Sequence, residues 1–218
     1  MPLLYQLSIY TALSLKVPQP KAGLEERFLT PFTNHHFGEK YPQLDYVLDR
    51  ENNNLPTNIN IYEFYFSSGS QLNNNISQQH YISQNYTHVA RDLAAAGINV
   101  VVQQVAKRGE QISLSSNPDV TLDLIDEMKK RGKSLLVVGV VNPEIPFLAG
   151  EALIHESQFD WLLDDAIPVP LFGVPRENVS AVDHAIGLHA SCLVKDGGTL
   201  QIVIGALSDA IVNALILR

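Results

Sequence analysis

The chain has 218 residues, of which 45% are hydrophobic and 17% are charged, so it is long enough to bury a substantial core. Its formal net charge of -8, with no basic run longer than residues 129–131, argues against nucleic-acid binding, because phosphate backbones require clustered Lys and Arg. The single cysteine, Cys192, excludes an intramolecular disulfide and favours a reducing, cytoplasmic location. The apolar stretch at residues 1–15 has neither the charged n-region of a signal peptide nor the length of a membrane span, so we expect no membrane association.

Apolar periodicity and turn residues predict an alternating series of strands and helices. In chain order, the predicted strands are residues 3–13, 59–66, 98–105, 110–115, 134–141, 169–172 and 199–204. The predicted helices are residues 21–36, 87–96, 119–131, 179–195 and 207–217. We expect Pro31 to distort or end the first helix, and the polar residues 41–60 to be a long connection. The predicted fold class is therefore α/β, with an open, mostly parallel sheet and flanking helices.

The two ends of the chain predict that it belongs to a longer protein. The last predicted helix is apolar nearly all round, and such a helix is normally buried on most sides. The chain stops at Arg218 directly after it, without a glycine cap or a polar tail. We expect residues 1–218 to be the N-terminal domain of a two-domain chain, and the bare last helix favours a homo-oligomer over a simple monomer.

The strongest local signal is residues 197–210, where a glycine turn, an apolar strand, Gly205 and a helix follow one another. A glycine at a strand end lets a ligand approach the backbone, and the free N–H groups of the helix start can bind an oxyanion or a phosphate. Gly205 and Ala206 are therefore candidate ligand-lining residues. The alternative is an ordinary strand-to-helix turn in which Ser208 or Asp209 is the N-cap.

The other candidate site residues also follow predicted strands. Ser67, Gly69 and Ser70 form a Ser/Gly turn that could supply hydroxyl and backbone contacts, or that is simply a turn. Asn117 precedes a predicted helix and is either its cap or a ligand-binding amide. Asn142 ends the most apolar strand, where its amide could orient a substrate carbonyl or merely begin a turn.

No residue of the chain is marked as a nucleophile or a metal ligand. His184 and His189 are five residues apart and lie on different faces of a helix, and no HExxH or GxSxG motif occurs. Cys192 lies in an apolar helical stretch and is expected to be a core residue. The sequence therefore predicts neither a catalytic residue nor a metal site within these 218 residues.

Several blocks of the sequence together resemble one protein family. The stretch DGGTLQIVIGALSDA at residues 196–210 resembles the DGGTLQIGIGALxDA stretch of the bacterial acetyl-CoA hydrolase/transferase family. Residues 81–93 and 114–124 are similar to this family too, as is the pair formed by residues 172–175 and 186–189. The blocks occur in the family's order and cover nearly the whole chain.

The resemblance implies a fold of the class I CoA-transferase type, built from two related open α/β halves. Its implied substrates are a coenzyme A thioester and a small carboxylate, with no bound cofactor. A glutamate in the second half attacks the acyl-CoA thioester and gives an acyl anhydride and then a glutamyl-CoA thioester. Transfer to a carboxylate or hydrolysis by water completes the cycle, and the first half lines the site with backbone donors.

This sequence departs from the family pattern in two ways. The catalytic glutamate belongs well after the Gly-Ala-Leu helix, so no glutamate here inherits its role, and the catalytic C-terminal domain is an expected partner. Val203 stands where the family has glycine, and its branched side chain narrows the approach to the backbone.

Two alternatives remain open. The first is a non-catalytic module that binds CoA or a sugar phosphate. The second is a truncated interaction protein whose bare last helix docks on a partner.

Overall fold

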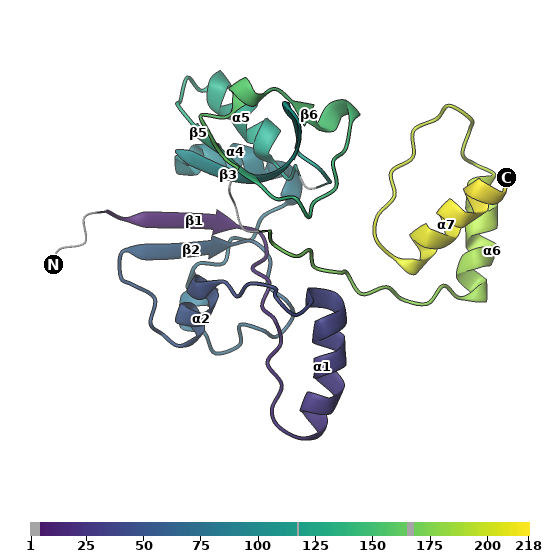
Figure 1. Cartoon of the computed structure of the whole chain (residues 1–218), viewed down its shortest axis with the longest axis horizontal. Coiled ribbons are helices and arrows are strands. Elements are labelled where there is room, and N and C mark those ends of the chain that lie inside the picture. The colour runs from purple at the N-terminus through teal and green to yellow at the C-terminus, as the bar shows by residue number, and fades with distance from the viewer. Residues whose placement is uncertain (1–4, 117, 165–167) are drawn as a thin grey trace. The chain divides into compact units, whose positions relative to one another are not determined.

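The computed structural model describes residues 5–116, 118–164 and 168–218. The chain divides into two compact units, Met1–Phe172 and Gly173–Arg218. The first unit contains two β-sheets with their helices, and the second contains a pair of helices (Figure 1). None of the helices in the described residues has the length and apolarity needed to cross a bilayer.

A two-stranded parallel sheet opens the first unit. It consists of β1 (Leu7–Thr11) and β2 (Ile59–Glu63), which lie side by side (Figure 1). The connection between them carries α1 (Leu24–Phe37) and α2 (Asp45–Glu51). Alternate residues of β2 are buried, which confirms the alternation expected of this strand.

A second, five-stranded sheet has the strand order β6-β4-β3-β5-β7. Its strands are β3 (Val100–Arg108), β4 (Gln111–Ser113), β5 (Leu136–Val141), β6 (Leu153–Ile154) and β7 (Trp161–Leu163). The central strands β3, β5 and β7 are parallel, whereas β4 and β6 pair antiparallel at one edge. The expected α/β class with a mostly parallel sheet is confirmed.

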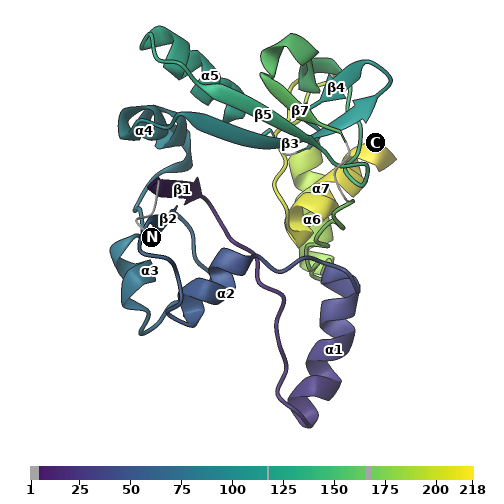
Figure 2. The ribbon, with the colours of Figure 1, turned by 60° about the vertical axis from the view of Figure 1, so that its left-hand side comes forward.

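Two helices cover this sheet and pack against each other, α4 (Val89–Ala96) and α5 (Thr121–Lys130) (Figure 2). Ala94, Leu124 and Met128 form their shared core, and each is at most 2% exposed. Gly97 ends α4 in the left-handed conformation, as its place after the predicted helix indicated. The shorter helical elements are α3 (Asn75–Gln79), η1 (Tyr86–His88), η2 (Gly150–Ala152) and η3 (Glu156–Gln158).

The second unit is built on α6 (Ala181–Ser191) and α7 (Ala206–Leu217). Gly187 lets the two helices approach closely, because a Cβ at this position would lie 2.8 Å from the carbonyl carbon and oxygen of Ala210. Ser180 begins α6 with a capping box that it forms with Asp183. Arg218 donates hydrogen bonds to the carbonyl oxygens of Ser191, the last residue of α6, and of Val194 beyond it, which ties the end of α7 to its partner helix.

One expectation about the first third of the chain is wrong, and one alternative of a second expectation is excluded. Residues 41–60 are not simply a connection, because α2 forms there, and its residues Val47 and Arg50 are buried. Pro31 does not end α1, which continues to Phe37. Phe37 is 4% exposed and packs on the rings of Tyr41 and Phe172, so tertiary contacts hold the helix beyond its proline.

Two predicted strands are also absent from the described structure. Residues 169–172 pair with no strand, and Val169 instead hydrogen-bonds the side chain of Asn142. Residues 199–204 form no strand, since the described part of their unit contains no other strand with which they could pair. The β-propensity of these residues favours an extended backbone, but a strand also needs a neighbouring strand with which it can form hydrogen bonds.

Candidate functional site

The turn after β2 contains three of the predicted site residues. The backbone N–H of Ser70 donates to the carbonyl oxygen of Ser67 at 3.0 Å, and Gly69 adopts a positive φ of 76°, which glycine tolerates. Both serines are exposed, and their hydroxyls have no hydrogen-bond partner in the described part of the chain. Ser67 and Gly69 line a cavity of about 440 Å³ together with the rings of Tyr65 and Tyr81. The turn can therefore offer hydroxyl groups next to an aromatic surface.

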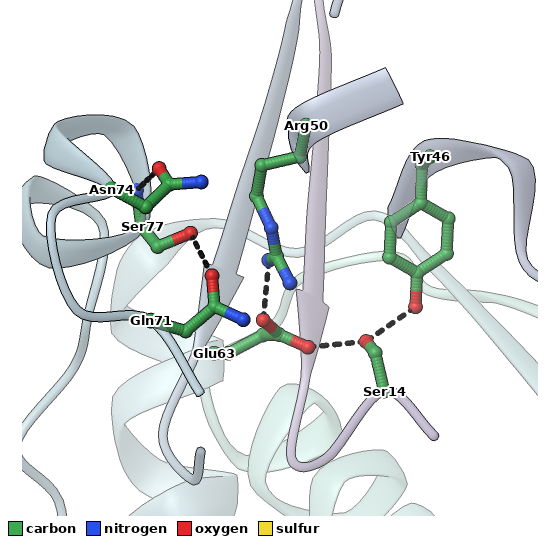
Figure 3. A network of polar contacts seen from close by, with 7 residues as sticks. All are labelled: Ser14, Tyr46, Arg50, Glu63, Gln71, Asn74 and Ser77. Carbon is green, nitrogen blue, oxygen red and sulfur yellow. Dashed lines mark hydrogen bonds and ion pairs between the residues drawn. The ribbon is translucent and has the colours of Figure 1, made fainter. Parts of the chain in front are cut away.

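A buried polar network lies at the strand end from which this turn starts (Figure 3). Glu63, the last residue of β2, is fully buried and accepts hydrogen bonds from Arg50 and from the hydroxyl of Ser14. Ser14 in turn shares a 2.6 Å hydrogen bond with the hydroxyl of Tyr46. The Arg50 guanidinium is 2% exposed and lies 5.5 Å from the centre of the Phe66 ring, although its Nε has no partner among the described residues.

This network joins β1, α2 and β2 at one end of the two-stranded sheet. Burial, followed by the charge of Glu63, raises the pKa of Tyr46, whereas its hydrogen bond to Ser14 acts in the opposite direction. The pairing of Glu63 with Arg50 was not predicted from the sequence. The signal that could have found Glu63 is its position on the apolar face of a strand, where an unpaired carboxylate would be unstable.

A second set of contacts shapes the chain that follows the turn. The side chain of Asn74 accepts a hydrogen bond from the backbone N–H of Ser77, and so caps α3. The hydroxyl of Ser77 donates to the side-chain oxygen of Gln71 at 2.7 Å (Figure 3). The turn is therefore held from both sides, by the buried ion pair before it and by the α3 cap after it.

Asn142 lies directly after β5 and is 1% exposed. Its amide nitrogen donates to the carbonyl oxygen of Val169 at 3.0 Å, and its amide oxygen accepts from the backbone N–H groups of Glu144 and Val169. These contacts fit the alternative in which Asn142 shapes a turn, and a ligand contact would require some of them to break. The predicted site residue Asn117 lies outside the described residues.

Gly205 and Ala206 lie in the second unit, at the start of α7. Gly205 is the N-cap and has φ 152°, and because glycine has no side chain to cap the helix, the first N–H groups of α7 are available. Both residues line a cavity of about 520 Å³, together with Arg176, Glu177 and Asp209. A Cβ on Gly205 would contact nothing within 4 Å.

The charges of this cavity decide which ligand group it suits. The guanidinium of Arg176 and the helix N-terminus favour a negative group, but the carboxylates of Glu177 and Asp209 line the same cavity. The cavity therefore suits a polar but uncharged group, such as a carbonyl oxygen that gains charge during a reaction, better than a free phosphate. Arg176 was not predicted as a site residue from the sequence, although it directly follows the Gly-Val-Pro segment at residues 173–175.

The predicted site residues thus fall into three places. Ser67, Gly69 and Ser70 share one turn, Asn142 lies in the five-stranded sheet, and Gly205 and Ala206 share the cavity of the second unit. Within the described ranges, no group of three or more His, Cys, Asp or Glu side chains could hold a metal ion.

Comparisons with known proteins give partial sequence matches. No protein-family model matches the chain. It is 36% identical to the 4-hydroxybutyrate coenzyme A transferase of Clostridium kluyveri over 76 residues, which make up 35% of this chain and 17% of that protein. It is 32% identical to the succinyl-CoA:cyclohexane-1-carboxylate CoA transferase of Geobacter metallireducens over 96 residues, 44% of this chain and 20% of that protein. The matches support a relationship to CoA-transferases.

Solved structures share the fold. RipA from Yersinia pestis superimposes with a TM-score of 0.56 and 23% identity, over 78% of this chain and 40% of that chain. A single-residue variant of RipA gives a TM-score of 0.57 and 21% identity over 97% of this chain and 49% of the other. The chain spans at most about half the length of the proteins it matches.

Proposed function

We propose that this chain is the acyl-CoA-binding half of a CoA-transferase or acetyl-CoA hydrolase, and that the nucleophilic glutamate lies outside these 218 residues. Its substrates would be an acyl-CoA and either a small carboxylate or water. The sequence matches to two CoA-transferases support the class, and the cavity at the start of α7 supports the role. We further propose a cytoplasmic location, in keeping with a lone, unpaired Cys192.

The observation that carries the proposal is the cavity formed by Gly205, Ala206 and Arg176. Free N–H groups at a helix start are suitable donors to the oxygen of a thioester carbonyl, which becomes an oxyanion when a nucleophile attacks the carbonyl carbon. Gly205 has φ 152°, a backbone conformation that L side chains rarely adopt, so we expect Gly205→Ala to disturb the backbone that presents these donors. In this proposal, Arg176 contacts the substrate and does not act as a nucleophile.

Independently of the cavity in the second unit, we propose the turn at residues 67–70 of the first unit as a contact for CoA. Its exposed hydroxyls and the neighbouring ring of Tyr81 suit the amide and hydroxyl groups of the pantetheine arm of CoA. Asn117 and Asn142 remain proposed amide contacts. Of these, Asn142 is the weaker candidate, because its amide is already bonded to backbone groups.

The proposal is tested by calorimetric titration of the whole chain with acetyl-CoA and, separately, with a sugar phosphate. We expect acetyl-CoA to bind and Gly205→Ala to weaken binding by about tenfold, which corresponds to about 1.4 kcal/mol. The matched control is Gly109→Ala, because Gly109 also has a positive φ and an open surrounding but lies in the β3–β4 turn. Arg176→Ala is compared in the same titration with the control Arg91→Ala, because Arg91 is an exposed arginine on α4.

Equal affinity of Gly205→Ala and Gly109→Ala for acetyl-CoA would overturn the assigned cavity. Binding of the sugar phosphate in place of acetyl-CoA would favour the non-catalytic module instead. Thioester loss is measured with and without acetate, and we expect none above background. Turnover would place the nucleophile inside this chain, with Glu177 as the first residue to replace because it lines the same cavity.

A further inference from the structure

A cavity of about 240 Å³ lies in the first unit, between α5 and the chain that leads into β7. Lys129 of α5 and Val137 of β5 both line it. Val137 is the second residue of β5, whereas Asn142 follows the other end of that strand. The cavity therefore lies at the amino-terminal end of β5, and it shares no lining residue with the cavities at Gly205 and at the turn of residues 67–70.

The floor of this cavity is apolar. Ile125, Met128 and Val137 line it, and each is at most 9% exposed. The partly buried Leu135, just before β5, completes the floor. At about 30 Å³ for each water molecule, the volume corresponds to about eight waters, so the cavity suits a ligand of about eight to ten non-hydrogen atoms. Such a ligand carries an apolar group of only a few carbon atoms.

Two lysines at the rim supply positive charge. Lys129 belongs to the last turn of α5, and Lys133 follows the end of this helix. Lys133 donates through Nζ to the carbonyl oxygen of Ala94 at 3.3 Å, and an ammonium group has further protons to donate. Glu127 of α5 pairs with Arg131, and neither lysine forms an ion pair with a described residue. Both ammonium groups are therefore available to the carboxylate of a ligand.

Acceptor groups come from the segment on the other side of the cavity lining. Gln158 is the last residue of η3, and Asp160 directly precedes β7. The Oδ2 of Asp160 accepts a 2.7 Å hydrogen bond from the backbone N–H of Val137, which holds the carboxylate at the cavity. Its Oδ1 and the side-chain amide of Gln158 have no hydrogen-bond partner among the described residues. The cationic and the anionic groups of the cavity therefore belong to different segments.

We propose that this cavity binds a free α-amino acid with a short aliphatic side chain. The carboxylate of the ligand accepts hydrogen bonds from Lys129 and Lys133, and its ammonium group donates to Oδ1 of Asp160. Its side chain lies on the apolar floor against Met128. A zwitterion satisfies both kinds of charge at once, whereas a dicarboxylate would be repelled by Asp160 and an alkylamine by the two lysines. Leucine, with about nine non-hydrogen atoms, has the size of the cavity.

The test is an amide NMR titration of the whole, isotope-labelled chain with L-leucine. We expect saturable shifts of the signals of Lys133, Gln158 and Asp160, with an affinity in the millimolar range. Isocaproate lacks only the ammonium group of leucine and isoamylamine lacks only its carboxylate, so each should bind at least about tenfold more weakly. Glycine, which lacks the apolar side chain, should also bind at least about tenfold more weakly. The absence of saturable shifts with leucine, or equal affinity for leucine and isocaproate, would overturn the proposal.

Substitutions at the rim provide an independent readout. Lys129→Gln should weaken leucine binding by about tenfold. The matched control is Lys130→Gln, because Lys130 is the next residue of α5 and does not line the cavity, and its effect should stay within about twofold. Asp160→Asn keeps an acceptor for the N–H of Val137 but removes the charge, so it should abolish the preference for leucine over isocaproate. Equal leucine affinity of the two lysine variants, or an undiminished preference in Asp160→Asn, would refute the proposed site.

Discussion

The buried ion pair of the first unit offers the sharpest test of how this fold is held together. Glu63 and Arg50 are 0% and 2% exposed, and Glu63 also accepts a hydrogen bond from Ser14 (Figure 3). Glu63→Gln keeps the shape of the side chain but removes its charge. Arg50 is then left as a buried cation whose remaining contacts are a neutral amide and the ring of Phe66.

The expected loss follows from this burial. Removing one partner of a buried ion pair typically destabilises a protein by about 3–5 kcal/mol, because the other charge stays desolvated and uncompensated. Against a typical total stability of about 5–15 kcal/mol, that is about a fifth or more of the whole. The double variant Arg50→Met/Glu63→Leu removes both charges, so it should recover most of the loss.

The assay is urea denaturation followed by circular dichroism near neutral pH. Glu51→Gln is the matched control, because Glu51 pairs with Lys16 at the surface and should contribute less than about 1 kcal/mol. If Glu63→Gln were no more destabilising than Glu51→Gln, the buried pair of Glu63 and Arg50 would not stabilise the fold. If Glu63→Gln does not fold, the double variant still tests the account, since it should fold.

Three further predictions concern other parts of the chain. Gly187→Ala should destabilise the second unit by about 1–3 kcal/mol in denaturant, because the new Cβ would lie 2.8 Å from the backbone of Ala210, and an unchanged midpoint would contradict the close packing of α6 and α7. Ser180→Ala should lower the stability by about 1 kcal/mol through loss of the α6 cap, and Ser180→Asp should restore most of it. Burial first, and then the hydrogen bond and charge of Asp119, raise the pKa of Tyr86 from 10.0 to about 12. The stability that this shift contributes is full below pH 10 and is lost as pH rises through about 12, so Tyr86→Phe should flatten the loss in that window, and an ultraviolet titration showing all tyrosines near 10 would refute it.

The sequence predicted most of the fold where local pattern and tertiary environment agree. Gly97 ends α4 as expected, and the apolar run before Asn142 forms β5 inside the sheet. The prediction was wrong where contacts distant in sequence decide the structure. α2 forms in a polar stretch because Val47 is buried and Arg50 pairs with the buried Glu63, and residues 199–204 form no strand because none lies beside them in the described part of their unit.

The candidate site was predictable only in part, for a physical reason. Gly205 and the Ser67 turn stand out because strand-to-turn junctions expose backbone groups, which is a local property. The contribution of Arg176 to the Gly205 cavity depends on bringing together residues some thirty positions apart, which no local pattern encodes. The burial of Glu63 likewise depends on α2, an element that the sequence pattern did not predict.

The central claim is that this chain binds an acyl-CoA at the start of α7, and the turn after β2 is proposed as a separate contact. The most direct measurement is an amide NMR titration of the whole, isotope-labelled chain with acetyl-CoA. The account predicts that the amide signals of Gly205, Ala206 and the turn at residues 67–70 shift in a saturable way, while that of Gly109 stays in place. Saturable shifts confined to other residues, or no shifts at millimolar acetyl-CoA, would contradict it.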